Sequence, residues 1–173
     1  MRSTLLPLAL VAAAIAGDRG ANPAQRGDRD SAGTQPAPAI QTVDGNFTKI
    51  VVIRLRNGVD LLDGLRKAVA EKGIKNAAIL SGVGSLTSYS IHVVDNTTFP
   101  PKEAFPKAEG PQDLVNVNGY VMEGRVHAHI TFSDQKAALG GHLEPGTRIF
   151  TFAVITLGVL DDKTSLAGFD GWR

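Results

Sequence analysis

The chain has 173 residues, 43% of them hydrophobic, which is enough for one domain with a proper core and too short for two of ordinary size. From Val43 onward, 14 basic residues face 14 acidic ones, and this neutrality argues against binding nucleic acid by bulk electrostatics. The chain has no cysteine, which excludes disulfides, thiolate metal sites and cysteine nucleophiles.

The N-terminus has the pattern of a secretory signal peptide. Arg2 is followed by the short apolar run Leu5 to Ala16, which ends in small residues and turns polar at Gly17. The run is too short to span a bilayer, and Pro7 interrupts it, so we expect no transmembrane anchor. The alternative is a buried N-terminal helix. Residues 1–16 are therefore predicted to be a signal peptide cleaved near Ala16, and the mature protein to be secreted or periplasmic.

Residues 17–42 are rich in Gly, Pro, Ala, Asp and Arg and nearly lack bulky apolar side chains. Such a segment cannot bury enough surface to offset chain entropy, so it is predicted to be a disordered linker. A single folded domain is expected over residues 43–161, followed by a C-terminal tail, 162–173, whose structure the pattern does not indicate. Asn46 and Asn96 begin glycosylation sequons, which matter only in a eukaryotic source.

The first half of the domain predicts strand, helix, strand. Residues 49–55 are dense in β-branched side chains, as in a strand. Leucines then recur at helical spacing between Asp60, which stands where an N-cap belongs, and Gly73, where the helix should stop. The next apolar strand, 76–86, contains glycines that indicate a bulge or a close backbone approach, and residues 88–95 continue it.

The second half predicts a run of strands after a long loop. The loop lies between Asp95 and Asp113 and holds four prolines. Four strand-like segments follow it, at residues 114–122, 124–134, 138–143 and 147–160. One helix followed by a run of strands favours an α+β fold with a mostly antiparallel β-sheet and one main amphipathic helix.

Three of the four histidines lie close together near the end of the domain. Because side chains alternate faces along a strand, His127 and His129 should point the same way, opposite to the apolar residues between and beside them. A hairpin could return His142 beside them, and Gly140 and Gly141 would let the backbones approach closely.

Three neutral imidazoles suit zinc or another divalent transition metal and leave a coordination position open for water or a substrate. The alternative is that the imidazoles are only hydrogen-bonded neighbours on a half-polar face. His92, Glu144 and Asp134 are candidates for orienting the three histidines through hydrogen bonds, although each also fits an ordinary structural role. No Ser-His-Asp order, phosphate loop or dinucleotide fingerprint is present, so any catalytic role depends on the histidines and no catalytic residue is assigned.

Several ordered motifs resemble one family. They are the R-L-x-x-G start at Arg54, the S-G-x-G-S turn at Ser81, the H-x-H strand at His127 and the G-G-H-L strand at Gly140. Together they resemble the plants-and-prokaryotes-conserved domain over roughly residues 47–160. The resemblance implies an α+β fold that assembles as a homotrimer, with the three histidines near a subunit interface as a possible metal site.

The family also includes plant nuclear proteins in which this domain is joined to AT-hooks that bind AT-rich DNA. No Arg-Gly-Arg-Pro hook occurs in this chain, and its domain is neutral. We therefore do not expect the nucleic-acid binding of the plant proteins in this chain. Three interpretations stay open: an exported trimeric module that binds a metal or a small ligand, a metal-dependent hydrolase using the same histidines, and a DNA-binding or protein-interaction scaffold.

Overall fold

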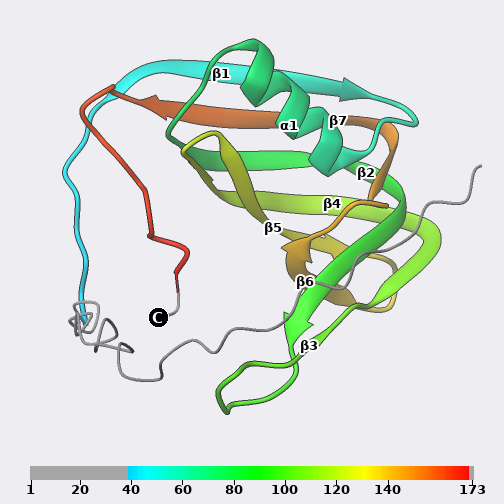
Figure 1. Ribbon diagram of the computed structural model, residues 1–173. Coiled ribbons are helices and arrows are strands. Elements are labelled where there is room, and N and C mark those ends of the chain that lie inside the picture. The colour runs from blue at the N-terminus through cyan, green and yellow to red at the C-terminus, as the bar shows by residue number, and fades with distance from the viewer. Residues whose placement is uncertain (1–38, 172–173) are drawn as a thin grey trace, which may run out of the picture. The chain divides into compact units, whose positions relative to one another are not determined.

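The computed structural model describes residues 39–171, and the predicted signal peptide and most of the predicted linker lie outside this range. The described chain forms one sheet with one helix lying across a face of it (Figure 1). Its elements are β1 (Phe47–Arg56), α1 (Leu61–Glu71), β2 (Ala77–Val94), β3 (Glu103–Ala104), β4 (Lys107–Met122), β5 (Arg125–Ser133), β6 (Ala138–Leu143) and β7 (Arg148–Leu160). The α+β prediction is confirmed. No helix within residues 39–171 is both long and apolar enough to span a bilayer.

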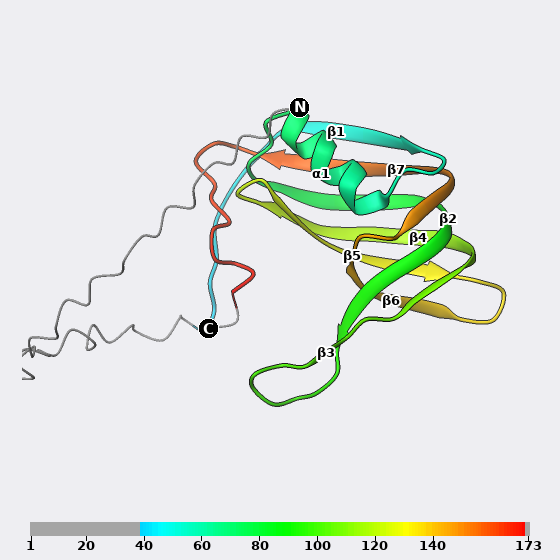
Figure 2. The same ribbon diagram turned by 45° about the vertical axis from the view of Figure 1, so that its right-hand side comes forward.

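The sheet has the strand order β1-β7-β2-β4-β5-β6, its pairings are antiparallel, and the short β3 pairs with β2. The end of β2 also pairs with β6, through Ile91 with Leu143 and His92 with His142. The strands β2, β4, β5 and β6 therefore close on one another, and the curved second half of β2 is visible where it descends toward β6 (Figure 2).

Helix α1 begins and ends where local chemistry predicts. The side chain of Asp60 accepts hydrogen bonds from the amides of Leu62 and Asp63, both at 3.1 Å, as an N-cap does. Gly73 follows the helix with φ +58°, a conformation that costs glycine little. The buried face of the helix packs on the sheet through Leu61, Leu62, Leu65 and Val69.

Strand β2 runs unbroken over 18 residues, with irregular register where the sequence predicted a bulge or a close approach. A Cβ at Gly84 would lie 2.2 Å from the carbonyl oxygen of Phe152, so only glycine lets β7 pass this closely. The bulges bend β2, so that it pairs with β7 in the open part of the sheet and with β6 in the closed part.

The predicted loop between Asp95 and Asp113 is too long. Strand β4 already begins at Lys107, which pairs with Ser90, and β3 occupies part of the remaining segment. The predicted loop extended past Pro111 because proline is uncommon within a central strand, but Pro111 lies within β4. It lies in the register irregularity between Glu109 and Gln112, where no ladder hydrogen bond is required of it.

Candidate metal centre

Strand β5 places two histidines on one face, as the alternation predicted. Ala128 and Ile130 are 1% and 2% exposed and belong to the core, whereas His127 and His129 point to the opposite side. The centroids of these two imidazole rings are 5.5 Å apart.

Strand β6 returns the third histidine beside them. In the β5–β6 hairpin, His142 is the direct cross-strand partner of His129. The ring centroid of His142 is 5.1 Å from that of His129 and 4.6 Å from that of His127, and both pairs meet edge to face. One ligand nitrogen from each of His127, His129 and His142 lies within 4.8 Å of the others. The hairpin geometry predicted from the sequence is therefore present.

Glycine at position 141 allows the three strands to meet here. A Cβ on Gly141 would lie 2.8 Å from the carbonyl oxygen of His92 and 3.0 Å from the side chains of both Ile91 and Val93. Real Cβ contacts are longer than this, so a larger residue would push β6 away from β2. The close approach of β6 to β2 thus places His142 and His92 side by side.

His92 and Glu144 form a second layer next to the histidine cluster. The ring of His92 stacks on that of His142, with centroids 4.3 Å apart and planes inclined by 26°. The Nδ1 atom of His92 lies 2.6 Å from Oε1 of Glu144, and its Nε2 lies 3.9 Å from Oε1 of Glu103. His92, His142 and Glu144 also have ligand atoms within 4.8 Å of one another.

Asp134 lies in the β5–β6 turn. Its side chain accepts hydrogen bonds from the amides of Lys136 at 2.7 Å and Ala137 at 2.9 Å. Ser133, the residue before it, pairs with Ala138 at the far end of the hairpin, four positions from the His129–His142 pair. The structure therefore gives Asp134 a turn-forming contact, and Asp134 belongs to neither group of clustered ligand atoms.

Burial favours the neutral form of two imidazoles of the cluster, those of His129 and His142. Burial, and then the nearby rings of His92, His127 and His129, lower the pKa of His142 to about 4. Burial also lowers the pKa of His129, and the neighbouring His127 and His92 lower it further. Neutral imidazole is the form that coordinates a metal. These shifts therefore reduce the competition between protons and a metal ion for the ring nitrogens.

The donor set fits a divalent transition metal. Imidazole nitrogen suits zinc, copper, iron and nickel, and zinc–nitrogen bonds of about 2.0–2.1 Å place tetrahedral ligands roughly 3.3 Å apart. The observed separations of up to 4.8 Å are within reach of small rotations of the imidazole rings. His127, His129 and His142 would hold the ion, and a three-ligand site leaves one position for water or another ligand.

The sequence did not predict two neighbours of His127. Tyr120 on β4 is its direct cross-strand partner, and Asp170 of the C-terminal tail lies close to it. The side chain of Arg125 donates a hydrogen bond of 3.2 Å to Oδ1 of Asp170, and this bond is the main reason that the pKa of Asp170 is lowered. No local pattern around Asp170 indicated this contact, because it joins segments 45 residues apart.

The fold and the histidine cluster define an α+β domain with a candidate metal centre. The family model described as the Plants and Prokaryotes Conserved (PCC) domain matches residues 43–161. The chain therefore belongs to this family, as the sequence motifs predicted.

Three solved structures share the fold. A metal-containing protein from Archaeoglobus fulgidus is 23% identical, with a TM-score of 0.62 over 69% of this chain and 86% of that chain. A plant- and prokaryote-conserved protein from Pyrococcus horikoshii is 21% identical, with a TM-score of 0.60 over 70% and 85% of the two chains. A protein from Bacteroides thetaiotaomicron, called a DNA-binding candidate, is 18% identical, with a TM-score of 0.58 over 66% and 83%.

One curated relative is much longer. The bifunctional protein GlmU of Synechococcus sp. (strain JA-3-3Ab) is 29% identical over 126 residues, which are 72% of this chain. The match spans 19% of the length of GlmU.

Proposed function

We propose that the protein is an exported, trimeric metal-binding module whose ion is held by His127, His129 and His142. The observation that carries the proposal is the convergence of three imidazole nitrogens within 4.8 Å of one another from two adjacent strands. The lowered pKa values of His129 and His142 support it, because neutral rings are ready to coordinate. The Archaeoglobus fulgidus protein that shares the fold is described as metal-containing, and this supports the proposal.

The three-histidine set is a better candidate than the alternative set of His92, His142 and Glu144. In that set, Nδ1 of His92 is already 2.6 Å from the Glu144 carboxylate, a distance at which the two side chains satisfy each other. The pair is placed to orient the ring of His142, on which His92 stacks. Zinc is the ion that we would test first, since three neutral imidazoles with an open position suit it well.

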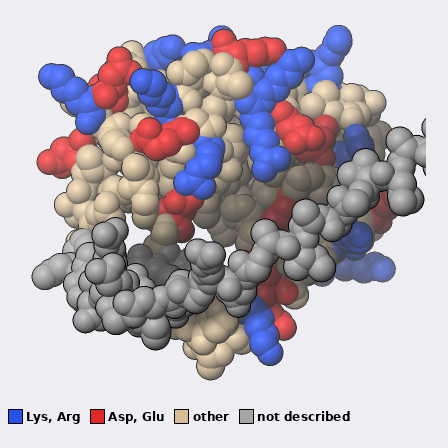
Figure 3. All heavy atoms as spheres, viewed as in Figure 1, with Lys and Arg blue, Asp and Glu red and all other residues tan. Residues whose placement is uncertain are grey.

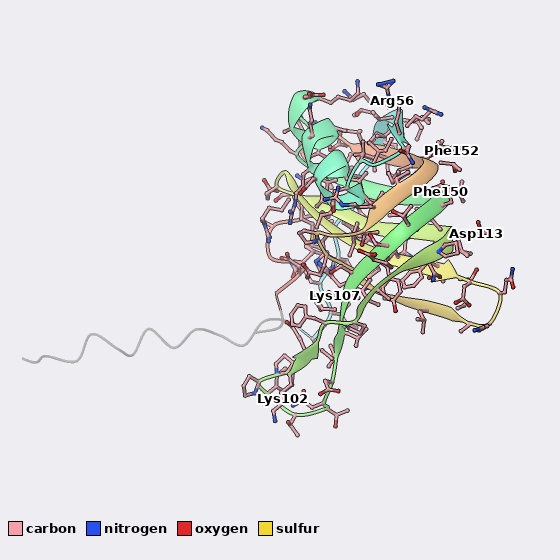
Figure 4. All side chains as sticks on the ribbon, turned by 90° about the vertical axis from the view of Figure 1, so that its right-hand side faces the viewer. Arg56, Lys102, Lys107, Asp113, Phe150 and Phe152 are labelled. Atoms are coloured by element: carbon pink, nitrogen blue, oxygen red, sulfur yellow. The ribbon has the colours of Figure 1, made fainter. Side chains whose placement is uncertain are left out.

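The assembly is the second part of the proposal. The sheet face opposite α1 exposes large apolar side chains, among them Ile50, Val52, Val83, Phe150 and Phe152, which are 41–64% exposed. Phe150 and Phe152 project from β7 away from α1, near Arg56 (Figure 4). Apolar surface of this kind is typical of a subunit interface. The number of subunits, three, is what the resemblance to the family implies.

Export is the third part of the proposal. It depends on the charged start, short apolar run and small residues of the first 16 positions. The mass of the protein recovered from cells tests it, because cleavage near Ala16 would leave a mature N-terminus at Gly17. Recovery of the protein with the apolar leader intact would contradict export.

Elemental analysis of the purified protein tests the metal site. We expect about one equivalent of metal per chain in the wild type and little in His127→Ala or His129→Ala. Thr131→Ala is the matched control, because Thr131 lies on the same face of β5 without belonging to the cluster. Wild-type protein that carries no stoichiometric metal, and gains no thermal stability from added zinc, would refute the site.

Two other activities would use the same molecule differently. A metal with an open position can lower the pKa of bound water, so a hydrolase is the second candidate, and a substrate screen of the zinc-loaded protein tests it. DNA binding is suggested by the description of the Bacteroides thetaiotaomicron protein. Basic and acidic side chains are interspersed on the face shown in Figure 3, an arrangement that does not favour a polyanion. Retardation of an AT-rich duplex at physiological salt would support DNA binding.

A further inference from the structure

A pocket of about 680 Å³ opens beside His127. Its walls come from the sheet, from the segment before β1 and from the C-terminal tail. The apolar side chains that line it are Val43, Phe47, Ala78, Met122, Leu160, Leu166 and Phe169. Its volume lies in the range of about 300–1,000 Å³ that is common for small-molecule sites.

The tail that closes the pocket is firmly attached to the sheet. Leu166 is only 5% exposed, and its amide donates a hydrogen bond to Oδ1 of Asn76 at 3.3 Å. The hydroxyl of Ser165 donates to Glu123 at 2.8 Å, and Asp170 is paired with Arg125. The partners are Asn76 just before β2, Glu123 in the β4–β5 turn and Arg125 at the start of β5. The wall therefore exists before any ligand binds, which lowers the cost of binding.

His127 connects this pocket to the candidate metal centre. It is a member of the three-histidine cluster and also lines the pocket, together with its cross-strand partner Tyr120. A ligand whose polar group approaches the cluster can therefore extend an apolar arm into the pocket, whose lining includes Met122 and Phe169. The two features share one side chain, and the ligand that fits both must have one polar end and one apolar end.

The charges around the pocket restrict that polar end. Among the described residues that line the pocket there is no lysine or arginine, and the one carboxylate, Asp170, is already paired with Arg125 outside the lining. A phosphate or another polyanion would find no cation here besides the metal itself. A single carboxylate is the better match, because one divalent ion can neutralise it and accept one of its oxygens.

We propose that the protein binds a small monocarboxylic acid, with its carboxylate at the three-histidine centre and an aryl or alkyl arm in the pocket formed with the C-terminal tail. This inference rests on the proposed metal site. It deepens that proposal by naming a ligand class, and it assigns the tail a binding role that the sequence did not indicate.

Titration calorimetry with two acids tests the inference on zinc-loaded, full-length protein. The probes are 4-phenylbutyrate and butyrate, which share the carboxylate and differ in the aryl arm. We expect 4-phenylbutyrate to have a Kd at least about tenfold lower, because the phenyl ring is transferred from water to an apolar pocket.

The variant Phe169→Ala separates the pocket from the metal. Phe169 is 37% exposed, so its truncation should leave the fold and the zinc content intact. We expect it to weaken 4-phenylbutyrate several-fold and to leave butyrate unchanged. Phe99→Ala is the matched control, because Phe99 is an exposed phenylalanine outside the pocket lining. Stoichiometric zinc with equal affinity for the two acids, or a preference that Phe169→Ala does not alter, would overturn the inference.

A protein that binds no zinc would refute the proposed metal site and still allow the pocket to be judged. Saturation-transfer NMR on the metal-free protein reports whether the phenyl protons of 4-phenylbutyrate contact the protein. Contact that Phe169→Ala abolishes and Phe99→Ala preserves would support the pocket, and absence of contact at millimolar acid would overturn it.

Discussion

Substitution of Gly141 by alanine should loosen the strand junction that positions His142. The added Cβ would lie 2.8 Å from the carbonyl oxygen of His92 and 3.0 Å from two apolar side chains. Ordinary contacts begin near 3.4 Å, so β6 would have to move by roughly half an ångström relative to β2. Backbone lies on one side of this contact and cannot rotate away, and overpacking of this kind costs about 1–3 kcal/mol of unfolding free energy.

Urea unfolding and zinc titration measure the two consequences. We expect Gly141→Ala to lower the unfolding free energy by about 1–3 kcal/mol and to weaken zinc binding about tenfold or more, because His142 moves with the strand. Ala138→Ser lies at the open end of the same strand, where residue 138 is exposed, and should change stability by less than about 0.5 kcal/mol. Wild-type stability and zinc affinity in Gly141→Ala would refute the argument that close β2–β6 packing places this histidine.

Three further predictions concern the same residues. The pKa of His142 is about 4 in the folded chain and about 6.5 when unfolded, so protons bind the unfolded state preferentially. The metal-free protein should therefore keep its full stability above pH 6.5 and lose on the order of 2 kcal/mol of unfolding free energy as the pH falls toward 4. Urea unfolding at several pH values measures this loss, which should be smaller in His142→Asn. Glu144→Ala should leave about one zinc per chain by elemental analysis and weaken its binding tenfold or less, whereas complete loss of zinc would assign the ion to the set with His92. For the proposed trimer, Phe152→Glu on the exposed face opposite α1 should shift the mass in light scattering to that of a monomer, and an unchanged mass would contradict an interface at this face.

Local patterns were sufficient where the deciding interaction is short in sequence. The cap at Asp60 bonds to amides two and three residues away, and the stop at Gly73 depends on one φ angle. The shared face of His127 and His129 follows from the two-residue period of a strand. The hairpin that returns His142 closes over a short turn, and the capping contacts of Asp134 hold that turn.

The bounds of the strands were harder to predict from the sequence. Prolines between Asp95 and Asp113 predicted an irregular loop, yet β4 begins at Lys107. Pairing with the curved β2 decides this, and a register irregularity accommodates Pro111. Whether a proline interrupts a strand depends on the partner strand, and the residues beside Pro111 pair with Ser88 and Leu86, which lie more than 20 residues earlier in the chain.

The sequence by itself determined the α+β class, the bounds of the helix and the orientation of the two histidines on β5, because each depends on neighbours within a few residues. Only the tertiary structure decided that β6 also pairs with β2, which stacks His92 on His142 across 50 residues of chain. It also decided that the tail returns to β5, where Asp170 meets Arg125 and a pocket forms beside His127. These contacts depend on the path of the whole chain, and a pattern of local periods carries no information about that path.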